Sequence, residues 1–314
     1  NGVGYEWAGL PNGVATIKGN VRKLIGGSNL SAGTYNITAK AINYFGEDSE
    51  TIVLTVEASA FPNTKSISFD SLKYLSAASD DVQDVFKRTG NGSGASDAWS
   101  IAFWFKPSSN TNNSQTVFYY GGDDQNNEGY IWARYLGGSS FRSIEFTYGT
   151  NNNRLKFLAP PHTFSVNQWH HVLITYDGGT TGSASGSMST YYGRFKIFVD
   201  GAQVTTSDSH SNYGFSGDIK SELFSVAKKG AGTSYLRSGT KLDELALWPS
   251  DQSGNISDIY NSGSTHDLSL LTSPPDHWWR MGDGDTFPTI QDNVGPADFV
   301  MYNMTAADIV TDAP

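Results

Sequence analysis

The acidic side chains are the first residues of this sequence whose types and spacing could do chemistry. Hydrolysis of a glycosidic bond uses two carboxyl groups that flank the bond, and two carboxylates reach the same face of a strand when one residue separates them. The stretch Ser143–Gly149 offers Glu145 alone, whereas Asp243 and Glu244 are adjacent and are therefore expected on opposite faces of a strand. This spacing disfavours such hydrolysis, and we expect no catalytic residues.

Two neighbouring histidines are the next candidates for catalysis. His170 and His171 follow Trp169 on an expected strand, so one should point into the core and the other outward. A serine nucleophile would need a Gly-x-Ser-x-Gly elbow between a strand and a helix, and the similar stretch 182–186 lies in a loop of Gly, Ser and Thr. We therefore expect one histidine to form hydrogen bonds in the core and the other to lie at the surface.

An oxygen-rich loop at 121–129 could bind a metal ion. It carries Asp123 and Asp124 beside two asparagines, and Ca²⁺ binds about six to eight oxygens from carboxylates, carbonyls and water. A loop of this composition is also typical of a solvated turn between two strands. The residues leave both interpretations open.

The segment 276–292, "DHWWRMGDGDTFPTIQD", combines two tryptophans with closely spaced acids. An EF-hand loop counted from Asp283 fails at the positions that need a polar ligand, a glycine and a glutamate, which hold Phe287, Pro288 and Val294. Strand alternation places Trp278 and Trp279 on opposite faces. The segment therefore predicts a closing strand followed by a turn, in which Asp292 accepts hydrogen bonds from backbone amides.

Aromatic side chains could form a platform for a sugar ring. On a strand over 129–135, alternation puts one aromatic set and a cation on the same face, and puts Ile131, Ala133 and Tyr135 on the other. Such a face could line a ligand groove or simply cover a sheet. The candidate ligand-binding residues are Tyr130, Trp132, Arg134, Tyr191 and Tyr192.

Composition narrows the class of protein. Of 314 residues, 21 are basic and 31 acidic, and a net charge of −10 disfavours nucleic acid as a partner. The absence of cysteine excludes disulfides, zinc–thiolate sites and thiol nucleophiles. The chain starts at Asn1 without a signal peptide and has no run near the roughly 18 apolar residues of a membrane span, so we expect a processed or partial chain without membrane insertion.

Short strand patterns separated by Gly, Asn, Asp and Ser predict an all-β protein. We expect an immunoglobulin-like block over 1–57, a linker over 58–64, and a two-sheet jelly roll over 65–314. Asp200-Gly201 predicts a type I′ hairpin, and 250–263 predicts one helical turn capped by Asn255 or Ser257. Strands are expected in the second block at 66–70, 99–105, 116–120, 129–135, 142–147, 154–158, 169–176, 193–199, 222–227, 240–247 and 277–282.

Five stretches of the second block, in this order, resemble a laminin-G-like, concanavalin A-like jelly-roll domain: "AWSIAFWFKPS", "VNQWHHVLITYDG", "GRFKIFVDGAQV", "KLDELALWPS" with "NISDIYNSG", and "HWWRMGDGD…QDNVG". The resemblance implies structural Ca²⁺ at the rim of the sandwich, with Asp243 as a ligand. A strand-end hydrogen-bond acceptor is the alternative role for Asp243. The Glu-x-Asp-x-x-Glu pattern of the related glucanases is absent.

The first block resembles an immunoglobulin-like repeat of bacterial or phage proteins, through "YEWAGLPNGV", "LSAGTYNITAKAINYFG" and "TIVLTV", and is expected to be incomplete at its N-terminus. A stalk of this kind before a lectin-like head resembles bacteriophage fibre and appendage proteins. The resemblance implies a non-enzymatic virion protein, a fibre, tail or capsid-decoration protein, whose head binds host glycans or neighbouring virion proteins. It also implies a homo-oligomer, preferentially a trimer. The alternatives are a secreted bacterial adhesin and, less favoured, a polysaccharide-degrading enzyme.

Overall fold

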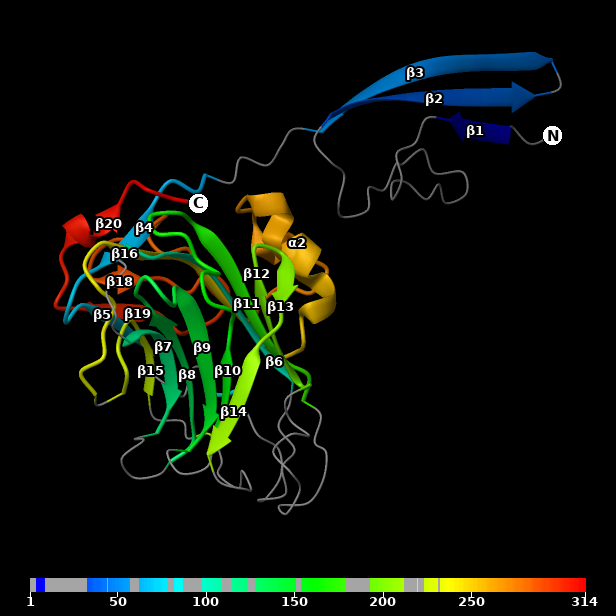
Figure 1. Ribbon diagram of the computed structural model, residues 1–314. Coiled ribbons are helices and arrows are strands. Elements are labelled where there is room, and N and C mark those ends of the chain that lie inside the picture. Colours follow the sequence, from blue (N-terminus) through cyan, green and yellow to red (C-terminus); the bar gives the residue numbers. More distant parts are fainter. Residues whose placement is uncertain are drawn as a thin grey trace. The chain divides into compact units, whose positions relative to one another are not determined.

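The chain divides into two compact units, residues 1–61 and 62–314 (Figure 1). Among the described residues, no helix is long and apolar enough to cross a membrane. The computed structural model describes residues 4–8, 33–43, 45–56, 62–77, 82–86, 98–108, 114–122, 128–150, 154–178, 193–211, 219, 223–230 and 232–314.

The first unit contains an antiparallel three-stranded sheet in the order β1 (Gly4–Ala8), β2 (Gly33–Asn43) and β3 (Gly46–Val56). In the register of β2 and β3, Tyr35 is paired with Leu54 and Asn43 with Gly46. The immunoglobulin-like assignment of this unit stays a prediction.

The second unit consists of two antiparallel sheets that lie face to face (Figure 1). The expected all-β class and two-sheet architecture are confirmed. The larger sheet has nine strands in the order β14-β10-β9-β8-β7-β15-β5-β19-β18. Its members are β5 (Tyr74–Ala77), β7 (Ser114–Gly121), β8 (Tyr130–Leu136), β9 (Ser143–Gly149), β10 (Arg154–Leu158), β14 (Ser207–Ser211), β15 (Leu223–Val226), β18 (Thr289–Ile290) and β19 (Phe299–Tyr302).

The eight-stranded sheet follows the order β13-β12-β11-β6-β16-β4-β20, with β17 paired to β16. Every strand expected in this unit is present within a few residues, while the strands at 74–77, 207–211, 289–290, 299–302 and 309–310 were not predicted. The members of this sheet are β4 (Ser66–Phe69), β6 (Trp99–Lys106), β11 (His170–Tyr176), β12 (Phe195–Val199), β13 (Ala202–Val204), β16 (Thr240–Trp248), β17 (His277–Trp279) and β20 (Ile309–Val310).

The core fills the space between the two sheets with aromatic rings from both. Trp99 on β6 lies 5.7 Å from Phe146 on β9, and Phe195 on β12 lies 4.8 Å from Phe157 on β10, as distances between ring centroids. All four side chains are buried, and each large apolar side chain contributes about 1.5–3 kcal/mol when fully buried. This core holds the sheets together and fixes which side chains face outward.

The hairpin between β12 and β13 is the predicted type I′ turn, because Asp200 and Gly201 both have positive φ, 49° and 80°. The expected helical turn is α2 (Ile256–Tyr260), which starts after Asn255 without a side-chain capping bond. A Cβ at Gly201 would lie 2.5 Å from the Tyr260 ring, so glycine lets α2 approach this turn. The 3₁₀ segments are η3 (Ser253–Asn255), η4 (Asn261–Gly263), η5 (Leu268–Leu270) and η6 (Ala306–Asp308).

The first and last strands of the second unit are neighbours. Strand β20 pairs with β4, and the Ser66 hydroxyl donates to the carbonyl of Asp312 at 2.6 Å. The ammonium groups of Lys106 and Lys241 each lie 2.9 Å from the Asp312 carboxylate. Although burial raises the pKa of Asp312, these bonds outweigh burial and lower it from 3.8 to about 2. The C-terminal segment is therefore attached to the sheet by charge as well as by strand pairing.

The closing segment has the predicted arrangement. Trp279 is fully buried in the core, and Trp278 lies on the outer face of the eight-stranded sheet. The Asp292 carboxylate accepts hydrogen bonds from His277 at 2.6 Å and from backbone amides that include those of Trp278 and Gly295. Although burial raises the pKa of Asp292, these bonds lower it below its ordinary value.

Two further acids of this segment also bind backbone amides. Asp285 accepts from the amides of Gly282 and Gln291, as expected for a turn-forming residue. Asp283 instead accepts from the amides of Thr64 and Lys65, so it attaches the segment that leads into β4. The acids of the closing segment thus act as acceptors for backbone N–H groups.

We predict that Asp292→Ala lowers the free energy of unfolding by about 3 kcal/mol or more, because several amide donors lose their acceptor and each such loss is worth roughly 1–3 kcal/mol. Urea unfolding followed by tryptophan fluorescence measures this change. The matched control is Asp276→Ala, at an exposed acid of the same segment, which should stay within about 0.5 kcal/mol of the wild type. Equal losses in both variants would contradict the role of Asp292.

Candidate functional site

The outer face of the nine-stranded sheet carries the predicted residues of β8. Tyr130, Trp132 and Arg134 lie on this face, whereas Ile131, Ala133 and Tyr135 belong to the core. The Tyr130 ring is fully buried and stacks on Tyr119 with 5.5 Å between centroids. The Tyr130 ring therefore lies beneath this face and is not exposed at its surface.

Trp132 is held between two cations. Its indole N–H donates to the Thr116 hydroxyl at 3.1 Å, and the Arg134 guanidinium and Lys229 ammonium lie 4.9 and 4.7 Å from its ring centroid. Arg134 also forms an ion pair with Glu145 at 2.6 Å. Cations in this position interact favourably with the electron-rich ring face and leave only 9% of Trp132 exposed.

A covering hairpin, made of residues 227–230 and 232–237, lies over this face. Its two sides meet where Lys228 pairs with Tyr235, and the Lys228 ammonium lies 4.4 Å from the centroid of the Tyr74 ring on β5. A Cβ at Gly230 would lie 3.1 Å from the Tyr119 ring, so glycine allows the hairpin to pass close to the sheet. The hairpin therefore places lysine side chains and Tyr235 over the sheet. The sequence pattern does not predict this contact.

A cavity of about 230 Å³ opens beside the covering hairpin. Hydroxyl groups, one aromatic ring and one guanidinium surround it, which is a chemical set that can bind polar ligands through directed hydrogen bonds. The Thr116 hydroxyl donates to that of Ser234 at 3.0 Å and so connects the cavity wall to the Trp132 cluster. The cavity is lined by Ser71, Leu72, Ser114, Thr233, Ser234, Tyr235 and Arg237. We call it the rim pocket.

Sequence reasoning did not find the rim pocket. Its residues come from a turn, from the start of a strand and from the covering hairpin. No helical or strand periodicity in the sequence indicates that these segments lie together. Among the predicted ligand-binding residues, Arg134 contacts the pocket directly, through a 3.3 Å bond to the Ser114 hydroxyl. Tyr191 and Tyr192 lie outside the described residues, as do the metal candidates Asp123 and Asp124. The binding roles of all these residues stay predictions.

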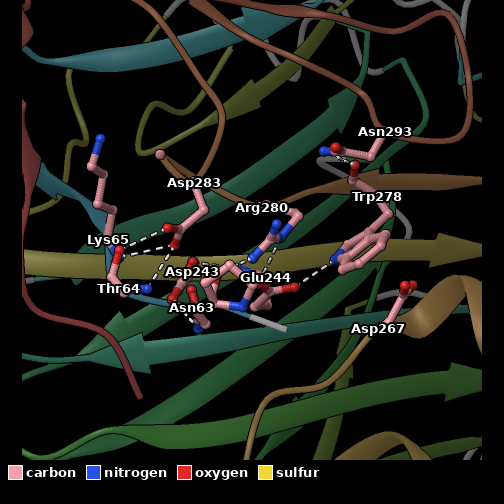
Figure 2. A network of polar contacts seen from close by, with 12 residues as sticks. Asn63, Thr64, Lys65, Asp243, Glu244, Asp267, Trp278, Arg280, Asp283 and Asn293 are labelled. Atoms are coloured by element: carbon pink, nitrogen blue, oxygen red, sulfur yellow. Dashed lines mark hydrogen bonds and ion pairs between the residues drawn. The ribbon is translucent and has the colours of Figure 1, made fainter. Parts of the chain in front are cut away.

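The adjacent acids on β16 are not on opposite faces, and that expectation is wrong (Figure 2). The register of β16 against β6 shifts between Asp243 and Ala246, and Glu244 has a positive φ of 48°. This β-bulge inserts one extra residue, so Asp243 and Glu244 both leave the core face while Leu242 and Leu245 both stay in it. Strand alternation fails wherever such a bulge occurs.

Asp243, which the resemblance implies as a Ca²⁺ ligand, lies fully buried beside Asn63 and Glu244, and its role as a ligand stays a prediction. Its two oxygens accept hydrogen bonds from the Asn63 side chain at 3.0 Å and from the Glu244 amide at 2.9 Å (Figure 2). Burial first, and Glu244 second, raise the pKa of Asp243 well above 3.8. Within the described part of the chain, no group of three or more His, Asp or Glu residues could hold a metal ion.

The second acid, Glu244, lies almost fully buried under residues 253–270, which contain η3, α2, η4 and η5 and which we call the helical segment. The Trp278 indole donates to it at 2.6 Å, and the Arg280 guanidinium lies 3.6 Å away (Figure 2). Burial raises the pKa of Glu244 from 4.5 to about 8, although Trp278 and Arg280 act in the opposite direction. A carboxyl group of this kind can be a catalytic acid, so its access to substrate decides its role.

The histidines are both buried, so the expectation of a surface histidine is wrong. His170 points into the core side of β11 and binds Asp200 at 2.7 Å. His171 points outward but is 2% exposed, because Trp104 and Tyr260 pack against it. Burial lowers the pKa of His171 from 6.5 to about 3, although Asp200 acts in the opposite direction.

Glu244 and His171 share a second cavity, on the outer face of the eight-stranded sheet, which Ile259 and Leu268 close from above. Its volume is about 10 Å³, roughly the space that one water molecule needs. A sugar ring does not fit there. The raised pKa of Glu244 therefore reflects burial beneath the helical segment and does not indicate a substrate site.

We predict that Glu244→Gln weakens the pH dependence of stability between about pH 6.5 and pH 8. In the wild type the folded state keeps a proton on Glu244 that the unfolded chain releases above pH 4.5, so the free energy of unfolding falls as the pH rises toward 8. His171 is neutral in both states over this window. Urea unfolding at several pH values measures the slope, and Asp276→Asn is the matched control; equal slopes in Glu244→Gln and wild type would refute the prediction.

Comparisons with known proteins place these observations in a family. No protein of curated function matches the chain. Similar structures include a heptameric SAP-like pentraxin from Limulus polyphemus, at 14% identity and a TM-score of 0.42, with 78% of this chain and 98% of the pentraxin covered. The CBM40 of the Ruminococcus gnavus IT-sialidase, bound to alpha2,3 sialyllactose, has 12% identity and a TM-score of 0.41, with 62% and 96% covered.

A third similar structure is that of botulinum neurotoxin type C, at 11% identity and a TM-score of 0.41, with 67% of this chain and 45% of the toxin chain covered. A family model described as the concanavalin A-like lectin/glucanases superfamily matches residues 80–254, which is more than half of the chain. This match agrees with the two antiparallel sheets, and it spans the first three of the five stretches noted in the sequence and "KLDELALWPS" of the fourth. The chain belongs to the concanavalin A-like lectin/glucanases superfamily.

Proposed function

We propose that the protein is a non-catalytic carbohydrate-binding protein whose lectin-like head binds a glycan in the rim pocket. The observation that carries this proposal is the contrast between the two outer faces. The nine-stranded sheet has a cavity of about 230 Å³ lined by hydroxyls, Tyr235 and Arg237. The cavity described on the eight-stranded sheet has a volume of about 10 Å³.

The rim pocket offers the two kinds of contact that a sugar requires. The ring of Tyr235 can pack against the apolar side of a sugar ring, while Ser71 and Ser234 can donate and accept hydrogen bonds with its hydroxyls. Below the pocket, Thr116 and the Trp132 cluster fix the position of Ser234. In this proposal, Trp132 and Arg134 act as positioning residues rather than as the stacking surface.

The same geometry favours binding over hydrolysis. Cleavage of a glycosidic bond would need two carboxyl groups that flank the ligand. The described lining of the rim pocket contains none. The acids with raised pKa, Asp243 and Glu244, are 0% and 4% exposed on the other sheet.

We predict that Tyr235→Ala lowers glycan affinity by about tenfold or more, as is usual for an aromatic side chain at the centre of a binding site. A glycan array probed with the purified chain, in CaCl₂ and in EDTA, identifies the ligand and tests the calcium requirement. Isothermal titration then measures the affinity of each variant. The control is Leu270→Ala, at a residue that is 60% exposed on the segment over the other sheet. Binding that Tyr235→Ala leaves intact, or no binding in either buffer, would contradict the proposal.

For the biological setting, we propose a virion appendage, in which the head is the host-binding or particle-binding part of a fibre, tail or capsid decoration. Three features of the sequence support this setting: the immunoglobulin-like resemblance of the first block, the lectin-like second block, and a 314-residue chain without cysteine. A secreted bacterial adhesin is the alternative, and the same head would serve it.

We predict that the protein is found in purified virus particles and not in the secreted fraction of infected or uninfected cells. Quantitative mass spectrometry of both fractions distinguishes the two settings. A fibre role also predicts a homotrimer, which light scattering of the purified chain measures. Recovery of the protein from the secreted fraction of uninfected cells would favour the adhesin and exclude the virion setting.

A further inference from the structure

Leu72, which lines the rim pocket, has an exposed side chain and a strained backbone. It is 59% exposed, so packing in the core does not account for a leucine at this position. The amide of Lys73 donates to the carbonyl of Asp70 at 2.9 Å and closes a β-turn, in which Leu72 has a positive φ of 76°. Glycine is favoured at such a position, because a side chain makes the left-handed conformation costly. Residues held in this way are found at functional sites more often than elsewhere.

Aromatic rings continue from the rim pocket along the outer face of the nine-stranded sheet. The Tyr235 ring in the pocket lining lies 6.3 Å from the Tyr74 ring on β5, as a distance between centroids. Tyr74 in turn stacks on Tyr302 of the neighbouring strand β19, with 4.8 Å between centroids. The Lys228 ammonium also lies over the Tyr74 ring, 4.4 Å from its centroid. Tyr74 is therefore partly covered and supports Tyr302, which is 43% exposed.

The turn that carries Leu72 is attached to the end of β19. The Asn303 side chain, next to Tyr302, donates to the carbonyl of Leu72 at 2.8 Å. Val300 lies two residues before Tyr302 on the same face of β19 and is also exposed. Together, Leu72, Val300 and Tyr302 form an exposed apolar surface that begins at the pocket, and we call it the apolar strip.

The rim pocket is too small to enclose an oligosaccharide. Pockets that enclose a drug-sized ligand have volumes of about 300–1,000 Å³, whereas the rim pocket has about 230 Å³. A sugar ring that packs on Tyr235 would therefore leave the next ring of the same chain outside the pocket. Leu72 belongs both to the pocket lining and to the apolar strip, so a chain that leaves the pocket past Leu72 reaches Tyr302.

We infer that the ligand of the rim pocket is an oligosaccharide of two or more rings, of which one packs on Tyr235 in the pocket and the next packs on Tyr302 in the apolar strip. Leu72 lies against the link between the two rings. This inference rests on the proposed carbohydrate-binding function and adds the length of the ligand and a second contact site. An aromatic side chain supplies a large, rigid apolar surface for the apolar side of a sugar ring, whose hydroxyls stay in water.

The test compares saccharides that differ in length. The probes are cello-, chito- and manno-oligosaccharides of one to four rings, together with shortened forms of the glycan that binds most tightly on the array. We expect two or more rings to bind about tenfold more tightly than one ring, because the second ring adds the contacts of the apolar strip. Isothermal titration measures each affinity. Tyr302→Ala should lose this gain in affinity, and Tyr302→Phe, which retains the ring, should keep it.

The variant Leu72→Gly separates a binding role from a structural one. It should lower the affinity for chains of two or more rings by about threefold to tenfold. Urea unfolding should show no loss of stability, since glycine adopts a φ of 76° without strain. The matched control is Phe141→Ala, which removes an exposed ring from the turn before β9, with four strands between β9 and β19. This control should keep the wild-type dependence of affinity on length.

The possible failures are distinguishable. Equal affinity for one ring and for longer chains would overturn the inference and leave the proposed function in place. The same conclusion would follow if Tyr302→Ala and Leu72→Gly both kept the wild-type dependence on length, or if Phe141→Ala lost it to the same extent. Absence of binding with every probe would overturn the proposed function as well.

Discussion

The structure of the second unit, residues 62–314, depends on one constraint. Both faces of each sheet carry large side chains, so both faces of each sheet must be covered. The inner faces cover each other through the aromatic core. The outer faces carry Trp104 and Trp278 on one sheet and Trp132 on the other, and each set needs its own cover. The helical segment with Ile259 and Leu268 closes the first face almost completely, whereas the covering hairpin closes the second with cations and leaves a cavity at its side. The different chemistry of the two covers explains why a binding function is proposed for only one sheet.

Acidic residues in the closing segment share a single role. Asp283, Asp285 and Asp292 each accept backbone N–H groups, and Asp243 accepts an amide and an asparagine side chain. A carboxylate that is surrounded by N–H donors already has the positive partners that a metal ion would otherwise supply. Spacing alone cannot separate these two roles, since both need oxygen atoms near turns.

The sequence predicts much of the fold and little of the site. Alternation on β8 correctly separates Trp132 from Ile131, and Asp200-Gly201 correctly marks a type I′ hairpin, because both signals are local. The faces of Asp243 and Glu244 were predicted wrongly, since a bulge depends on the partner strand β6 and leaves no mark in the alternating pattern. One of the two histidines was expected at the surface, and this expectation is wrong because the residues that bury His171, such as Tyr260, lie far away in sequence. The rim pocket escaped prediction for the same reason: Ser71, Ser114 and Tyr235 meet only in the folded chain.

The pairing of β4 with β20 has a topological consequence. The head begins and ends on adjacent strands, with Ser66 bonded to Asp312. Closely spaced ends of this kind allow a domain to be inserted into a surface loop of another protein without separating its sheets. They also allow circular permutation, in which the two ends are joined and new ends are made in a loop. The second unit is thus suited to transfer into another protein, which would display the face that carries the rim pocket on a scaffold of a different symmetry.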